Sequence, residues 1–97
     1  MANRAVAVIG AGTMGAGIAQ VCAQSGWQTR LFDVFPEGLD AGMQRINAFW
    51  DKGIERGKTT AEQKEKWLQN LTPVRELSDA LTGVELVIEA VPEILEL

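Results

Sequence analysis

The sequence predicts an α/β fold with a doubly wound parallel sheet of about four strands in the order 3-2-1-4. A β-branched apolar run over residues 5–9 ends at a glycine, as a buried parallel strand does. A helical pattern follows at once, and a second strand-like run covers residues 28–32. Helical and strand-like segments continue to alternate along the rest of the chain, and this alternation is typical of strands that pair in parallel.

A glycine motif joins the first strand to the first helix. Residues 10–15 read Gly10-Ala11-Gly12-Thr13-Met14-Gly15, a complete G-x-G-x-x-G. Gly10 permits a sharp turn through dihedrals that a Cβ forbids. Gly12 leaves room for a pyrophosphate to approach the main chain, and Gly15 lets the helix pack closely on the strand. The free N–H groups of the first helical turn and the positive end of the helix dipole then face the phosphates.

An acidic residue, Asp33, follows the second strand-like run. It lies 18 residues after Gly15, close to the spacing of about 20 in the dinucleotide fingerprint. Its oxygens can accept hydrogen bonds from the 2′- and 3′-hydroxyls of an adenosine ribose, and its charge repels a 2′-phosphate. Val34 and Phe35 offer no cation to reverse that preference. The pattern predicts a Rossmann-type site for NAD rather than NADP, against the simpler interpretation of an ordinary glycine turn and a solvated acid.

The two helices that flank the second strand have apolar positions at helical spacing. In the first, which Gly26 is expected to end, the predicted buried face is Met14, Ile18, Val21, Cys22 and Ser25. The second begins near Pro36 and runs to about residue 56, and Gly57 ends it. Its predicted face is Leu39, Met43, Ile46, either Phe49 or Trp50, and Ile54. Gly42 and Gly53 weaken this helix by about 1 kcal/mol each relative to Ala.

The remaining segments complete the alternation. Thr60 and Gln63 form a capping-box pattern that starts a third helix, which ends near Asn70. Residues 71–74 are expected to be a brief strand, and Pro73 favours an edge position. Residues 76–81 are a short helix or turn that closes near Gly83, and residues 85–90 read as a buried strand.

Composition indicates one soluble globular domain. The 97 residues are 46% hydrophobic, and 9 basic against 13 acidic residues leave a net charge of −4. With no basic patch and no apolar run near 20 residues, neither a nucleic-acid partner nor a membrane span is expected. The N-terminus passes directly into the first strand, so no signal peptide is expected. The single cysteine, Cys22, is interpreted as core packing, and a reducing, cytoplasmic setting follows as the default.

Four longer stretches resemble a known family. VAVIGAGTMGAGIAQ, LFDV, the GKTTAEQ turn and LVIEAVPEILEL are similar to the N-terminal NAD-binding portion of 3-hydroxyacyl-CoA dehydrogenases, including the 3-hydroxybutyryl-CoA enzymes. The resemblance extends from Arg4 to Leu97. The E-A-V-P-E turn and the extended glycine motif are more specific than G-x-G-x-x-G alone, and the long helical excursion after the second strand also fits this family.

The resemblance implies particular roles. It assigns the cofactor loop to residues 10–15, the ribose acid to Asp33 and a further cofactor contact to Glu93, which pattern alone leaves equally open as a helix-starting acid. The family's helical hairpin touches the CoA moiety, which makes Arg56 and Lys58 candidates. From pattern alone these two cations are a solvated turn, just as Trp50 and Trp67 are helix packing.

The resemblance also implies what residues 1–97 lack. In the family a His, held by a Glu, removes the hydroxyl proton while NAD takes a hydride, and a His suits this role because its pKa lies near working pH. This sequence contains no His. We therefore expect no catalytic residue and no metal ligand here. Residues 1–97 are interpreted as an incomplete, truncated NAD-binding domain that binds NAD without catalysis, in a parent that acts on acyl-CoA substrates through a further helical domain.

Two other functions remain open at this point: the cofactor half of a related dehydrogenase for hydroxy acids or carnitine, and a binding-only half-domain. The predicted strand order leaves the last strand with an unpaired apolar edge, and such edges invite self-association. A homo-oligomer formed through residues 86–91 is therefore a further hypothesis.

Overall fold

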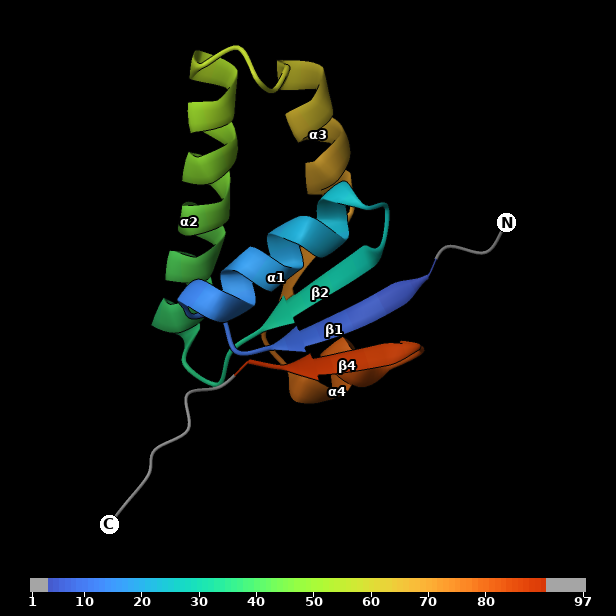
Figure 1. Ribbon diagram of the computed structural model, residues 1–97. Coiled ribbons are helices and arrows are strands. Elements are labelled where there is room, and N and C mark those ends of the chain that lie inside the picture. The colour runs from blue at the N-terminus through green and yellow to red at the C-terminus, as the bar shows by residue number, and fades with distance from the viewer. Residues whose placement is uncertain (1–3, 91–97) are drawn as a thin grey trace.

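The computed structural model describes residues 4–90 as four strands and four helices (Figure 1). In chain order these are β1 (Ala5–Ile9), α1 (Thr13–Gln24), β2 (Gln28–Phe32), α2 (Pro36–Glu55), α3 (Ala61–Gln69), β3 (Leu71–Val74), α4 (Leu77–Leu81) and β4 (Leu86–Glu89). The predicted alternation of strands and helices is confirmed along this whole range.

The four strands form one sheet in the order β3-β2-β1-β4, with every neighbouring pair parallel. The predicted fold class and strand order are therefore confirmed. Pro73 in β3 lies at an edge, as expected for a residue without a backbone donor. The central pair β1 and β2 aligns Ile9 with Phe32, so these two strands end side by side.

Helices cover both faces of the sheet. In Figure 1, α1 crosses one face of β1 and β2, and α4 lies against the opposite face. The core beneath α1 includes Val8 and Leu31, which are fully buried. On the other side, the Arg30 guanidinium of β2 donates hydrogen bonds to the carbonyl oxygens of Asp79 and Thr82 and so caps the end of α4.

The predicted buried face of α1 is wrong. Met14 and Val21 are 60% and 59% exposed, whereas the residues that contact the core are small: Gly15, Ala16, Ala19 and Ala23. The reason is the short distance between α1 and the sheet, which leaves no space for large side chains. The larger apolar residues are displaced to the flanks, where Ile18 packs partly against the core.

Helices α2 and α3 form a hairpin that projects away from the sheet (Figure 1). Trp50, not Phe49, is buried, at 1% exposure against 61%. Its ring lies 5.5 Å from that of Trp67, and its indole N–H donates to Gln24 Oε1 at 3.0 Å. The Trp pair therefore ties α2 to α3 and to the end of α1, as the packing interpretation predicted.

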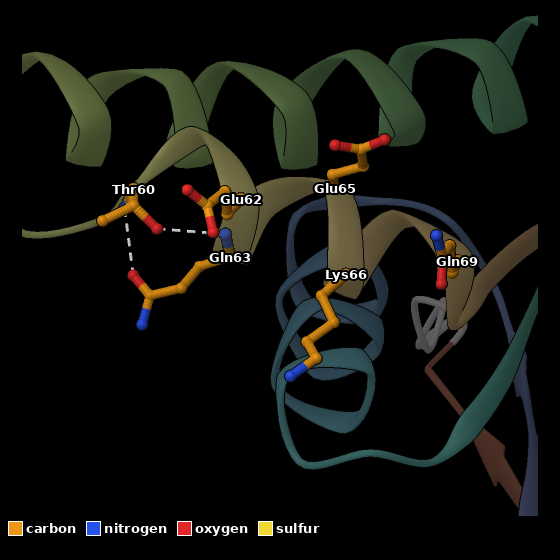
Figure 2. A pocket seen from close by; sticks show the side chains of 6 residues that line it. All are labelled: Thr60, Glu62, Gln63, Glu65, Lys66 and Gln69. Atoms are coloured by element: carbon orange, nitrogen blue, oxygen red, sulfur yellow. Dashed lines mark hydrogen bonds between the residues drawn. The ribbon is translucent and has the colours of Figure 1, made fainter.

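The capping box that starts α3 is confirmed. The backbone N–H of Gln63 donates to Thr60 Oγ1 at 3.1 Å, and that of Thr60 donates to Gln63 Oε1 at 2.9 Å (Figure 2). Across the hairpin, Lys64 Nζ lies 2.6 Å from Asp51 Oδ1. Among residues 4–90, no helix combines the length and the apolar character needed to cross a membrane.

The strand expected within residues 85–90 is confirmed as β4, but the expectation that it is buried is wrong. Leu86 and Val87 are each 45% exposed. β4 pairs with β1 on one side only, so the sheet ends there within the described residues. Apolar side chains of a strand at the end of a sheet are buried only where another strand or a helix covers them. The composition of the strand cannot reveal whether such a neighbour is present.

Candidate functional site

The carboxyl ends of β1, β2 and β4 meet at one edge of the sheet. β2 and β3 lie on one side of β1 and β4 lies on the other, so the strand order reverses at β1. The N–H of Gly10 donates to Phe32 O at 2.7 Å, and the N–H of Ala90 donates to Ile9 O at 2.8 Å. In open α/β sheets, ligands bind outside the strand ends at such a reversal.

The three motif glycines have different surroundings. Gly10 has a φ of 107°, a conformation that L side chains rarely adopt. A Cβ built on Gly15 would lie 1.7 Å from Gly10 O, so the predicted close packing of helix on strand is confirmed. A Cβ built on Gly12 would meet no heavy atom of residues 4–90 within 4 Å, apart from its chain neighbours. Nothing described in the protein itself therefore requires glycine at position 12.

The N-terminus of α1 faces the open space beside Gly12. Gly12 is the N-cap, no side chain caps the helix, and the first turn carries no acid. The first hydrogen bond of the helix runs from the N–H of Ala16 to Gly12 O, at 2.8 Å. The N–H groups of Gly12, Thr13 and Met14 have no hydrogen-bond partner among residues 4–90. These donors and the helix dipole create a positive potential suited to an anion.

Asp33 lies directly beside this turn. Its Oδ2 accepts a hydrogen bond from the N–H of Ala11 at 2.8 Å, and its Oδ1 accepts one from the N–H of Phe35 at 2.9 Å. The sequence indicated that Asp33 follows the second strand, but it did not indicate this bridge. One consequence is that the Ala11 amide is already satisfied within the protein, so the unsatisfied donors of the turn begin at Gly12.

Two glycines of α2 complete the surroundings. A Cβ on Gly38 would lie 3.1 Å from the Asp33 carboxyl carbon, and one on Gly42 would lie 2.6 Å from Ala11 O. The sequence showed Gly42 only as a weak point of the helix. Their i, i+4 spacing on the helix that follows the acid is the signal that could have identified them as a close-contact face.

Large apolar side chains border the same region. Met14, Val34 and Phe35 are 60%, 72% and 67% exposed. Two of them follow Asp33 directly and the third belongs to the glycine motif, so they lie next to the positions expected for ribose and phosphate. Exposed apolar side chains beside a few polar groups are typical of small-molecule sites.

The remaining predicted residues lie elsewhere. Glu93 falls outside the described residues. Arg56 and Lys58 lie at the turn between α2 and α3, at the far end of α2 from Asp33 (Figure 1). There they line a hollow of about 170 Å³ together with Phe49, Lys52, Gly53 and Thr59. Cys22 is partly buried on α1, and this burial raises the pKa of its thiol, which opposes a reactive thiolate.

The arrangement fits a dinucleotide. It offers unsatisfied backbone donors for a diphosphate, clearance at Gly12 for its approach and a carboxylate next to it for a ribose. The Asp33 carboxylate has about four lone-pair directions, of which two accept from the protein, so it retains capacity for ribose hydroxyls. This combination of clearance and unsatisfied donors is the physical feature that a cofactor would use.

The chain is similar in sequence and structure to known dehydrogenases. The chain is 48% identical over 91 residues to a 3-hydroxyadipyl-CoA dehydrogenase from Escherichia coli, covering 94% of this chain and 19% of that protein. It is 34% identical over 93 residues to a probable 3-hydroxybutyryl-CoA dehydrogenase from Bacillus subtilis, covering 96% and 32%. The crystal structure of an (S)-3-hydroxybutyryl-CoA dehydrogenase from Ralstonia eutropha superposes with a TM-score of 0.89 at 32% identity, covering 97% and 33%.

The chain thus spans a third or less of the length of each of these relatives. Residues 5–97 match the family described as 3-hydroxyacyl-CoA dehydrogenase, NAD binding domain. That match covers the glycine turn, Asp33 and the whole sheet, and it confirms NAD as the family's cofactor. The chain therefore belongs to the NAD-binding domain family of the 3-hydroxyacyl-CoA dehydrogenases.

Proposed function

We propose that this chain binds NAD at the edge formed by β1, β2 and β4 and supplies the cofactor half of an oxidoreductase. The reaction is the interconversion of 3-hydroxyacyl-CoA and 3-oxoacyl-CoA. The observation that carries the proposal is the uncapped N-terminus of α1 beside the open space at Gly12. Bound NAD supplies the hydride acceptor for oxidation of the hydroxyl-bearing carbon.

Each cofactor-binding residue has a distinct role in this proposal. Gly10, Ala11 and Gly15 are buried and shape the turn, while Gly12, Thr13 and Met14 are exposed and present their amides to the diphosphate. Asp33 accepts hydrogen bonds from the adenosine ribose hydroxyls through its remaining lone pairs. Glu93 is proposed, from the family resemblance, as a further cofactor contact.

The preference for NAD over NADP follows from charge. The Asp33 carboxylate lies where a 2′-phosphate would come, and two like charges in contact repel. Val34 and Phe35, which follow it, bring apolar side chains rather than a cation. We therefore expect NADP to bind much more weakly than NAD.

Proton transfer is assigned to residues outside this sequence. A general base for the substrate hydroxyl needs a pKa near the working pH, and the 97 residues include no histidine. The chain alone is therefore expected to bind NAD without turning over substrate. We propose that residues 1–97 are one part of a longer enzyme, as the lengths of the relatives suggest, and that this enzyme works in the cytoplasm.

The acyl-CoA partner is proposed to contact the tip of the α2–α3 hairpin. Lys52, Arg56 and Lys58 gather three positive charges around a hollow next to Phe49, which is 61% exposed. Cations suit the phosphates of CoA, and an exposed aromatic ring suits its adenine. Replacing Arg56 and Lys58 together by Ala should weaken CoA binding without changing NAD affinity, because the two regions lie at opposite ends of α2.

Isothermal titration calorimetry with NAD, NADH and NADP tests the main proposal. The wild-type chain should bind NAD and NADH, and NADP at least about tenfold more weakly, since a single unfavourable contact of 1.4 kcal/mol is a factor of ten. Asp33→Ala should weaken NAD binding, because hydrogen bonds to a charged acceptor are worth roughly 1.5–3 kcal/mol. Glu37→Gln, which removes a similar charge from the first turn of α2, serves as its matched control and should leave NAD affinity unchanged. A folded wild-type chain that binds neither NAD nor NADH would refute the proposal.

A further inference from the structure

The bridge between Asp33 and Ala11 continues the pairing of β1 with β2 beyond the strands. The ladder ends with Ile9 opposite Phe32, and the N–H of Gly10 still donates to Phe32 O at 2.7 Å. The N–H of the following residue, Ala11, donates to the Asp33 side chain at 2.8 Å. In a regular strand the N–H after Gly10 would point away from β2, so the carboxylate links the glycine turn to the end of β2 where the backbone ladder has already ended.

The same carboxylate also fixes the chain that leaves β2. Its second oxygen accepts the N–H of Phe35, so both oxygens are held by backbone donors two and twenty-two residues away. Gly38 of α2 lies against this carboxylate, and a Cβ there would approach the carboxyl carbon to 3.1 Å, so a larger residue at position 38 would press on Asp33. One helical turn later, Gly42 leaves similar space for the fully buried Ala11.

We propose that Asp33 is a positioning residue that holds the glycine turn in its NAD-receiving form before NAD arrives, and that Gly38 and Gly42 of α2 set its place. This inference rests on the proposed function, since the turn that Asp33 holds is the one assigned to the diphosphate. It goes further by giving Asp33 a second role, distinct from contact with the ribose. The first donors of the phosphate site, at Gly12 and Thr13, follow immediately after the residue that Asp33 anchors.

The chemistry of the bridge requires a carboxylate. Two N–H donors point at the two oxygens, and an ionised carboxyl group accepts both. An asparagine in the same place accepts only one and turns its own NH₂ toward the other donor. Neutralising Asp33 in order to admit a 2′-phosphate should therefore loosen the turn. We expect Asp33→Asn to bind NAD more weakly without binding NADP more tightly.

Amide hydrogen exchange of the wild-type and Asp33→Asn chains, measured by NMR without any cofactor, tests the positioning role. The Ala11 or the Phe35 amide should exchange roughly 3- to 10-fold faster in Asp33→Asn, the range that one lost hydrogen bond produces. The amide of buried Leu31 should be unchanged, which shows that the sheet is intact. Glu37→Gln should change none of these amides. Unchanged protection at both Ala11 and Phe35 in a folded Asp33→Asn chain would overturn the proposal.

A second measurement needs no variant. In the wild-type chain, NMR should detect scalar couplings through the hydrogen bonds between the amide nitrogens of Ala11 and Phe35 and the side-chain carboxylate carbon of Asp33, because both bonds are short, at 2.8 and 2.9 Å. This result covers the case in which Asp33→Asn fails to fold. A folded wild-type chain that shows neither coupling would contradict the bridge.

Binding separates the two roles of Asp33. Nicotinamide mononucleotide has a phosphate but no adenosine ribose, so a ribose contact alone predicts that Asp33→Asn weakens NAD and leaves this mononucleotide unaffected. The positioning role predicts that both weaken, the mononucleotide by about 3-fold or more. If the wild-type chain bound neither ligand, the proposed function would fail, while the amide measurements would still decide the positioning of the turn.

Discussion

Three glycines near the start of α1 offer a direct test of how the site is built. Gly12, Gly15 and Gly17 lie within six residues of one another, yet a Cβ would have a different effect at each. At Gly15 it would meet the protein, and at Gly12 and Gly17 it would meet no described atom within 4 Å. Replacing each glycine by alanine adds the same methyl group. Differences in stability or NAD affinity between the three variants therefore reflect the different surroundings of the three positions.

Gly15→Ala should destabilise the fold. The added carbon would lie 1.7 Å from Gly10 O and 2.7 Å from its carbonyl carbon, and backbone atoms cannot move aside as a side chain can. Overpacking typically costs about 1–3 kcal/mol, and this contact belongs at the upper end or beyond. A domain of this size unfolds with roughly 5–15 kcal/mol, so a loss of about 3 kcal/mol should lower Tm by about 12–24 °C.

Gly12→Ala should leave stability nearly unchanged and weaken NAD binding. Its φ of −69° and extended ψ suit alanine. Alanine is a poorer N-cap than glycine, but it reduces the entropy of the unfolded chain, and the two effects of about 0.5–1 kcal/mol offset each other. The methyl group would occupy the approach to the main chain that we assign to the diphosphate. An overlap worth about 1–3 kcal/mol corresponds to roughly a 5- to 150-fold loss of affinity.

Gly17→Ala is the control, because position 17 is exposed on α1 and lies outside the turn. It should stabilise the chain by about 1 kcal/mol through helix propensity and leave NAD affinity unchanged. Chemical denaturation and calorimetric titration of the three variants give both quantities. If Gly12→Ala binds NAD as tightly as the wild-type chain, the clearance at Gly12 is not where the diphosphate comes, and the assignment of the site is wrong.

Three further predictions concern packing, reactivity and assembly. Trp50→Ala should cost about 3–5 kcal/mol in denaturation, because a buried ring is lost, whereas Phe49→Ala should stay within about 0.5 kcal/mol; equal effects would contradict the hairpin packing. Because burial raises the pKa of the Cys22 thiol, iodoacetamide should label the folded chain more slowly at neutral pH than it labels an unfolded chain. The labelling rate should continue to rise with pH beyond the pH range in which an ordinary thiol ionises. The open edge at β4 should make the chain self-associate at high concentration, and Val87→Lys should return it to a monomer in sedimentation; a wild-type chain that stays monomeric would rule this out.

Local chemistry explains which predictions from sequence were correct. Gly10, Gly26, Gly57 and Gly83 all have positive φ where a turn or helix end was expected, because the backbone conformation there depends on the residue itself. The Thr60 and Gln63 box was likewise predictable, since both partners lie within four residues. These features need no knowledge of distant parts of the chain.

The errors concern contacts between distant segments. Helical periodicity selected Met14 and Val21 for the core of α1, whereas the short helix–sheet distance admits only residues such as Ala16 and Ala19. The same principle applies to β4, whose apolar composition indicated burial although one side has no described neighbour. Hydrophobicity indicates which side chains favour burial, but the available space decides which of them are buried.

The sequence by itself determined the alternation of strands and helices, the strand order, the place of the glycine turn and the family, because each depends on short motifs or on their order along the chain. Only the tertiary structure showed that Asp33 is bonded to Ala11, that Gly38 lies against Asp33 and that Gly42 lies against Ala11. This arrangement brings three segments of the chain together. It depends on how closely α2 approaches the glycine turn, and spacing along a chain does not specify that distance.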